Sequence, residues 1–250
     1  MLAMTVRPWP KDEGASMSCG LFGKLPGKRD FIALNAPTAF LSAYERWLQG
    51  GLTASRVELG AGWQDAFLNA PIWRFWFGSA VCGITVAGAF MPSVDGVGRY
   101  FPLTVFALAG AGAAIPPPEL DPQDAWFAQL EDFLLGALEP EASYEAVGQA
   151  LATLSAPSDD LKAAPPADMV RLSDGTIVSA LDAATFPARL SALRVEDHAR
   201  AYANACYLWT IGGDDFEPLA LVGHGLPNPY LFTGLLTGRF DAFLGAGSAA

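Results

Sequence analysis

The sequence predicts an α/β fold in which helices cover both faces of a mixed, largely antiparallel sheet. Apolar segments with helical spacing alternate along the chain with short runs rich in β-branched and aromatic residues. The connections between the central runs are too short for helical crossovers, which favours antiparallel pairing. Apolar residues make up 52% of the 250 positions and charged residues 16%, so the chain can bury a large core and is not disordered.

The first half of the chain contains one long helix and the central strands. A helix is predicted at residues 37–56, where Pro37 suits the first turn and large apolar side chains recur on one face. Strands are predicted at 72–77, 84–91 and 102–109. These three strands form the centre of the expected sheet.

One stretch of this half has the length of a membrane span. Residues 75–94 carry no charge over 20 positions, which meets the length criterion for a transmembrane helix. Gly78, Gly83, Gly88 and Pro92 interrupt the stretch, and its β-branched residues favour strands. We therefore expect two buried strands joined by a turn, and no direct membrane insertion.

The second half contains further helices separated by two connectors. Residues 110–124 are rich in Gly, Ala and Pro, and a strongly periodic helix is predicted at 122–138. A second helix is predicted at 143–154. A second connector, at 155–168, contains helix-breaking prolines. The remaining predicted elements are a weak strand at 176–181, a helical segment at 185–200, hairpin strands at 203–211 and 217–223, and a final helix at 228–243.

Charge is distributed unevenly between the two halves. The chain carries 15 basic and 26 acidic residues, a formal charge of −11. Residues 1–100 hold 9 basic and 7 acidic groups, whereas residues 101–250 hold 6 and 19. This balance argues against a nucleic-acid binder and against a polybasic membrane anchor, since both need clustered Lys and Arg.

The cysteines and the N-terminal residues indicate a cytoplasmic protein. Cys19, Cys82 and Cys206 are odd in number, far apart and in apolar surroundings, so we expect buried thiols in a reducing compartment. Residues 1–17 lack the continuous apolar run of a secretory signal. We expect them to form a flexible segment.

Motifs for catalysis, phosphate binding or metal binding are missing from the sequence. Gly23-Lys24 is followed by Leu25, so the hydroxyl residue of a phosphate-binding loop is absent, and neither a nucleophile elbow nor a dinucleotide-binding glycine pattern occurs. The only histidines are His198 and His224, which leaves little room for a zinc site. No catalytic residue, metal or cofactor is predicted.

Two Gly- and Pro-rich segments place charges in otherwise apolar sequence, at residues 20–31 and 91–103. Their composition predicts shaped loops beside the sheet. On a structural interpretation, Asp30 and Asp95 pair with arginines to hold the loops in a buried polar network. On a functional interpretation, the same charges line a ligand or partner site. The arginines available for pairing are Arg74 and Arg99.

Several short motifs in and around these segments form a specific pattern. They are Gly23-Lys24-Leu25-Pro26, Asp30-Phe31, Trp47-Leu48, Pro71-Ile72-Trp73-Arg74-Phe75, Cys82-Gly83, Met91-Pro92-Ser93-Val94-Asp95, Gly98-Arg99-Tyr100-Phe101-Pro102-Leu103, Leu208-Trp209, Glu217-Pro218 and Gly225-Leu226-Pro227. Over about 18–109 and 203–243, the chain resembles the TagF family, also called ImpM, of type VI secretion-associated proteins. Arg29 stands where the family usually has glycine.

The resemblance implies a single α/β domain over residues 18–245, built as a three-layer α/β/α sandwich. The charge count and the predicted helices make residues 110–200 an acidic, partly helical middle region of this domain. It also implies a cytoplasmic accessory protein without enzymatic activity. TagF-like proteins are regarded as post-translational repressors of secretion that bind the forkhead-associated (FHA) domain protein of the system. The resemblance does not indicate an oligomeric state.

The family motifs give a set of candidate motif or partner-binding residues. They are Lys24, Pro26, Asp30, Arg74, Ser93, Asp95, Arg99, Tyr100 and Trp209. We expect the two loops to form one surface at the sheet edge that presents Lys24, Arg74 and Arg99 to an acidic or phosphorylated partner segment. The acidic region at 110–200 is a second candidate contact, for a basic FHA surface.

Two other classes of function are compatible with the sequence. A small hydrolase or transferase with a site near His224 and Asp95 requires those side chains to converge in one concave pocket. A structural subunit of the secretion apparatus is distinguished by dose, since overproducing a repressor silences secretion and overproducing a structural component need not.

Overall fold

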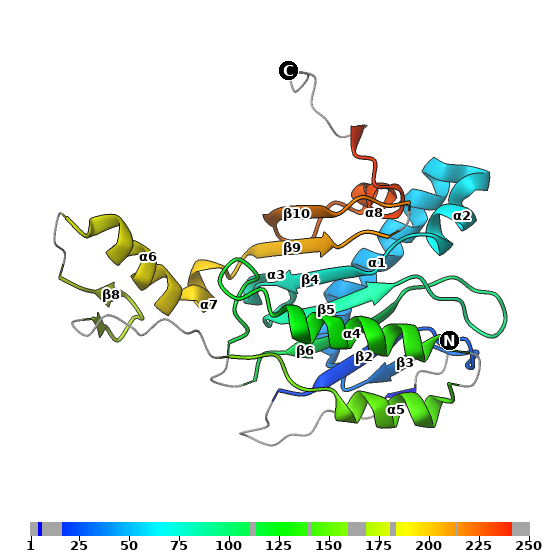
Figure 1. Cartoon of the computed structure of the whole chain (residues 1–250), viewed down its shortest axis with the longest axis horizontal. Helices are drawn as coiled ribbons and strands as arrows, with labels where there is room; N and C mark the ends of the chain where they lie inside the picture. Colours follow the sequence, from blue (N-terminus) through cyan, green and yellow to red (C-terminus); the bar gives the residue numbers. More distant parts are fainter. Residues whose placement is uncertain are drawn as a thin grey trace.

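An eight-stranded sheet forms the centre of the structure (Figure 1). This computed structural model describes residues 5–6, 17–110, 114–139, 142–159, 169–180, 184–213 and 215–241. The strands are β1 Thr5–Val6, β2 Cys19–Gly23, β3 Ile32–Leu34, β4 Trp73–Phe77, β5 Val86–Met91, β6 Leu103–Leu108, β9 Ala205–Thr210 and β10 Leu219–His224. Their order is β1-β3-β2-β6-β5-β4-β9-β10, and only β1 and β3 pair in parallel. The mixed, largely antiparallel sheet is therefore confirmed.

Helices cover both faces of the sheet, which confirms the three-layer architecture. One face packs against α1 Thr38–Leu59, α2 Trp63–Leu68, α3 Ser79–Cys82 and α8 Phe232–Thr237. The other face packs against α4 Asp124–Ala137 and α5 Tyr144–Thr153. Figure 1 shows α4 and α5 in front of the sheet and α1 behind it.

The alternation of side chains along each strand produces two separate cores. In β4, Trp73, Phe75 and Phe77 join the core beneath α1, whereas Trp76 joins the core beneath α4. Arg74 alternates onto the α4 side as well. The central strands read as continuous apolar runs because both of their faces are buried.

Residues 20–31 differ from the prediction, since their first part forms a strand. β2 lies between β3 and β6 in the interior of the sheet. A Cβ at Gly20 would lie 2.5 Å from the Phe106 ring, and a Cβ at Gly23 would lie 2.1 Å from the Pro102 carbonyl oxygen. These glycines resemble turn residues in the sequence, but here they allow close approach between strands.

The predicted helices of the second half are present, and part of this half forms an arm. β7 Val170–Arg171 and β8 Ile177–Val178 pair only with each other, and with α6 Phe186–Glu196 and α7 His198–Ala201 they extend away from the sheet (Figure 1). The final helix is shorter than predicted. It comprises a 3₁₀ turn, η2 Pro229–Leu231, followed by α8, which ends at Gly238 in the left-handed conformation.

Two predicted segments lie largely outside the described residues. Most of the N-terminal segment 1–17 does so, although Thr5–Val6 pair with β3. The second connector is described only up to residue 159. Residues 75–94 form β4, the short helix α3 and β5 as expected, and within the described ranges no helix is both long and apolar enough to span a bilayer.

The three thiols generate the first testable prediction. Cys19, Cys82 and Cys206 are buried and unpaired, as predicted, and burial raises the pKa of Cys82 and Cys206 to about 12. At pH 8 the thiolate fraction is then lower by roughly three orders of magnitude than in the unfolded chain. We expect all three to react slowly with Ellman's reagent in the native protein and rapidly in guanidinium chloride. One thiol that titrates rapidly under native conditions would contradict this placement.

Candidate functional site

A buried carboxylate at the end of β5 organises the motif segments. Asp95 Oδ2 accepts hydrogen bonds from Lys24 Nζ and from Arg99 Nε, the latter at 2.7 Å. Lys24 and Asp95 are 3% and 4% exposed. One carboxylate therefore bonds two cations and neutralises one of their two charges, and the three side chains form a single network.

The backbone around Asp95 closes onto the same carboxylate. Asp95 Oδ1 accepts from the backbone N–H groups of Val97, at 3.0 Å, and Arg99, at 2.9 Å. The Asp95 N–H donates to the Arg99 carbonyl at 3.1 Å, and Val94 forms an isolated bridge with Tyr100. An aspartate at a tight turn commonly bonds its own backbone in this way. The loop between β5 and β6 is thus fixed by one side chain.

The ionisation of Asp95 reflects two opposing effects. Burial removes water from the carboxyl group and by itself raises its pKa. Hydrogen bonds from Lys24, Arg99 and Val97 stabilise the carboxylate more strongly, so the pKa of Asp95 lies well below its ordinary value. Asp95 is ionised at neutral pH and has no proton to exchange there.

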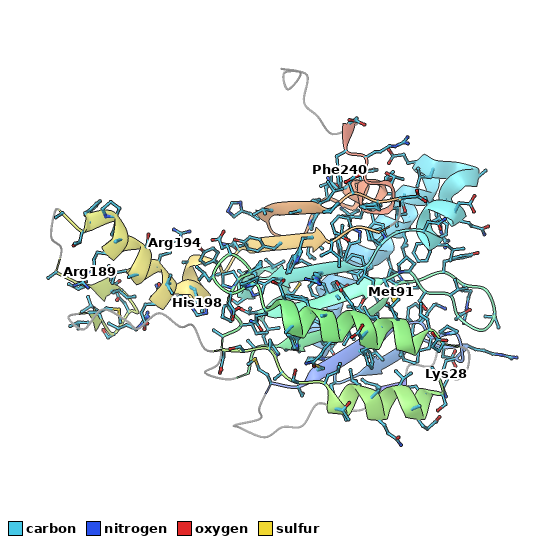
Figure 2. The ribbon with its side chains drawn as sticks, in the orientation of Figure 1. Lys28, Met91, Arg189, Arg194, His198 and Phe240 are labelled. Atoms are coloured by element: carbon cyan, nitrogen blue, oxygen red, sulfur yellow. The ribbon has the colours of Figure 1, made fainter. Side chains whose placement is uncertain are left out.

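The two loops contact each other, as predicted, but they lie at the ends of strands in the interior of the sheet and not at the sheet edge. Ser93 Oγ donates to the Lys24 carbonyl at 2.7 Å, and the Gly96 N–H donates to the Lys28 carbonyl at 3.1 Å. Arg99 Nη2 also donates to the carbonyl of Arg29. Figure 2 shows Lys28 at the end of the molecule opposite the arm.

Close packing between the loops explains a glycine of the second segment. A Cβ at Gly96 would lie 2.9 Å from the carbonyl oxygen of Pro26. Pro26 is half-buried at this contact, whereas Asp30 is exposed at the rim of the surface. Of the two acidic residues that the structural interpretation proposed, Asp95 forms the predicted pair with Arg99 and Asp30 takes no part in the network.

Arg74 belongs to a different part of the structure. Its Nε donates to Glu131 Oε1 at 2.7 Å, and its Nη1 lies 3.5 Å from Asp124 Oδ1. Both carboxylates are on α4. The guanidinium carbon lies 5.4 Å from the ring centroid of Phe127, against which Trp209 packs edge-on at 4.8 Å. Arg74 and Trp209 therefore hold α4 against the sheet.

The expectation that three cations are presented to a partner is wrong for two of them. Lys24 is paired with Asp95, and Arg74 is 6% exposed and paired with α4. A strand position beneath a helix buries a long cationic side chain when a carboxylate is available nearby. Arg99 is exposed, with 46% of its side chain accessible.

Sequence reasoning missed the partner of Arg74, although a signal was present. Glu131 lies one residue after Leu130 and four after Phe127, so it shares the apolar face of α4. A carboxylate on an otherwise apolar helix face indicates a buried cationic partner. Arg56 and Trp63 line the same hollow as Arg99. The sequence gives no signal of this, because these residues come together only in the folded chain.

A hollow of about 770 Å³ lies beside Arg99. Its lining residues are Arg56, Gly60, Ala61, Trp63, Gln64, Gly98, Arg99 and Tyr100. Tyr100 is half-buried and packs edge-on against Trp63, with ring centroids 5.5 Å apart. A second hollow, of about 910 Å³, lies between α1 and η2 and includes Arg46, Val57 and Tyr230.

The side chains required by the hydrolase or transferase alternative do not converge. The pairing of β10 with β9 and of β9 with β4 places His224 at the sheet end that holds Phe77 and Val86. Asp95 lies beyond Met91, at the opposite end of β5, and the ends of such a strand are separated by roughly 17 Å. Across the described ranges, no three His, Cys, Asp or Glu residues are grouped to hold a metal ion.

Comparisons with known proteins identify the family and the fold. A family model described as the TagF N-terminal domain, type VI secretion system-associated, matches residues 20–154, which is more than half of the chain. A crystal structure of PA0076 from Pseudomonas aeruginosa PAO1 is 37% identical to the chain, with a TM-score of 0.73, and the match covers 90% of this chain and 96% of that one. No curated protein matches.

Removal of the Asp95 charge tests the network. Asp95→Asn leaves Lys24 buried without a counter-charge, which typically costs about 3–5 kcal/mol. We expect urea denaturation at pH 7 to show a loss of this size in the free energy of unfolding. Asp30→Asn is the control, because Asp30 is exposed in the same surface, and it should change stability by less than about 0.5 kcal/mol. Equal effects of the two substitutions would contradict the network.

The pH dependence of stability provides a second test. Because the pKa of Asp95 is lower in the folded protein than the ordinary value of about 3.9, its ionised form stabilises the fold above about pH 4. That contribution is lost as the pH falls below about 4. We therefore expect the stability difference between the wild type and Asp95→Asn to narrow between pH 5 and pH 2.5 in urea titrations. A constant difference would contradict the assigned ionisation.

Proposed function

Because the chain belongs to the family of type VI secretion system-associated TagF N-terminal domains, we propose that it is a non-enzymatic cytoplasmic repressor of secretion. In this proposal it acts after translation, by binding the FHA-domain protein of the same system. Family membership gives the accessory role in type VI secretion, and the repressor action and the partner are inferences from the resemblance.

The observation that carries the proposal is the loop surface around Asp95. The motif residues of both loops meet there and fix each other through one buried carboxylate. The acid of this network is ionised and fully hydrogen-bonded, which suits positioning better than proton transfer. A rigid surface that exposes Arg29 and Arg99 is suited to recognition of a partner because little order is lost on binding.

The acidic middle region supports a second contact. Residues 110–200 hold 15 acidic and 5 basic side chains, and much of this region forms α4, α5 and the arm. Such an excess of negative charge attracts a basic protein surface and accelerates association. A partner that touches both regions would meet a basic patch at the loops and an acidic one at the helices.

Binding and dose test the proposal together. Titration calorimetry of the purified protein against the FHA-domain protein from the same gene cluster, phosphorylated and unphosphorylated, should give saturable binding with a defined stoichiometry. In the parent bacterium, overproduction of this protein should silence secretion. Overproduction of a structural subunit of the apparatus is the control, and it need not silence secretion. Absence of binding to both forms would overturn the FHA partnership, and unchanged secretion on overproduction would overturn the repressor role.

A further inference from the structure

We propose that the hollow between Arg56 and Arg99 binds an anionic side chain of the partner, with the two guanidinium groups as ligands for its oxygens. The inference rests on the proposed function for the identity of the partner. It goes further in naming the site, the residues and the chemical class of the bound group, which is a phosphoryl group or a carboxylate. Arg56 approaches from the last turn of α1, and Arg99 approaches from the loop between β5 and β6.

Arg56 is held in position by a fixed aromatic ring. Its guanidinium carbon lies 4.2 Å from the ring centroid of Trp63. Trp63 is 4% exposed, donates from Nε1 to Ser55 Oγ at 2.9 Å and stacks on Phe67 with centroids 4.9 Å apart. A guanidinium that stacks on a ring keeps its N–H donors free in its own plane. Arg56 therefore presents these donors in a defined direction with little freedom to lose.

Arg99 is fixed from the other side of the hollow. Its Nε donates to Asp95 Oδ2 at 2.7 Å, and its Nη2 donates to the Arg29 carbonyl. These bonds use the edge of the guanidinium formed by Nε and Nη2, and among the described residues Nη1 makes no hydrogen bond. Both arginines are exposed, so an anion can reach them without a rearrangement of the core.

The site carries a net positive charge, although the net charge of the whole chain is negative. Asp95 is shared by Lys24 and Arg99, so one positive charge of this trio remains uncompensated. Arg56 adds a second, since no carboxylate of the described residues forms an ion pair with it. None of the described lining residues is acidic, although the chain as a whole carries −11. Uncompensated arginines attract and orient oxyanions.

The size of the hollow favours a side chain carried by a protein segment. At about 770 Å³ the hollow is larger than a single phosphoryl or carboxylate group requires, so residues that flank the anion can be accommodated. Gln64 adds a side-chain amide to the lining, whereas the backbone N–H groups of Gly60 and Gly98 are already donated to the carbonyls of Arg56 and Asp95. Arginines grouped around one site are typical of recognition of a short acidic or phosphorylated motif.

Small probes test the site without the partner. N-acetyl-O-phosphothreonine methylamide, N-acetylglutamate methylamide and the uncharged N-acetylthreonine methylamide are titrated into ¹⁵N-labelled protein, and the arginine Nε–Hε resonances are followed by NMR. We expect saturable shifts at Arg56 and Arg99 with an anionic probe and none at Arg46, an exposed arginine of the same helix in the other hollow. A response to the phosphorylated probe alone identifies a phosphoryl site, and a response to both anions identifies a general oxyanion site. Equal shifts with the uncharged probe, or no shifts, would overturn the inference.

Matched variants then separate this inference from the proposed function. Arg56→Ala should weaken binding of the FHA-domain protein about tenfold or more, as expected for loss of a charge-assisted contact, while Arg46→Ala should change it less than about twofold. Arg56→Lys keeps the charge but loses the planar fork, so it should restore only part of the affinity. Thermal melting checks that the variants fold.

Failure of the anion site and failure of the proposed function would give different results. If the wild type binds the FHA-domain protein and Arg56→Ala binds it equally well, the anion site is wrong and the proposed function stands. If the wild type does not bind the FHA-domain protein but the anionic probes shift Arg56 and Arg99, the anion site stands and the partner is wrong.

Discussion

The loop surface depends on the hydrogen bonds and ion pairs of the buried Asp95 carboxylate. It receives two cationic side chains and two backbone N–H groups, so it determines both the conformation of its own loop and the position of the first loop through Lys24. A buried ion pair contributes little net stability compared with an apolar replacement, but removing one partner is costly. The network is therefore better understood as a means of fixing one conformation than as a source of stability.

The double-sided sheet supplies the rigid base for that network. Alternate residues of β4 enter the two cores, and Arg74 joins the sheet to α4 through Glu131 and Asp124. On the opposite face, the aromatic cluster beneath α1 includes Trp63 and Phe67, and Tyr100 packs against it. The loop after β5 is thus attached to one core through Tyr100 and to β2 through Lys24. Its position follows from the packing of the fold and not from local propensity alone.

The sequence was sufficient to predict the layers and most of the long elements, because periodicity reports burial directly. It was insufficient for β2, because Gly20 and Gly23 by themselves favour a loop. Only the structure shows that the Phe106 ring and the Pro102 carbonyl lie where a side chain at these positions would be. Pairing of Asp95 with Arg99 was predictable, since the two are four residues apart in a turn. The position of Glu131 on the apolar face of α4 indicates a buried cationic partner, but it does not identify Arg74, which lies 57 positions away in the chain.

The positions of the carboxylates determine which cations remain available to a partner. Lys24, Arg74 and Arg99 occur in similar apolar motifs, and the sequence does not distinguish a buried cation from an exposed one. The distinction is set by where carboxylates lie in space: Glu131 and Asp124 neutralise Arg74, and Asp95 neutralises only one of its two cations. The uncompensated charge appears at Arg99, because Lys24 is enclosed and Arg99 is at the rim.

Arg56 is exposed for a different reason, since an aromatic ring and not a carboxylate holds it. Two independent structural causes thus place two exposed guanidinium groups around one hollow, both from residues 1–100, where basic side chains outnumber acidic ones.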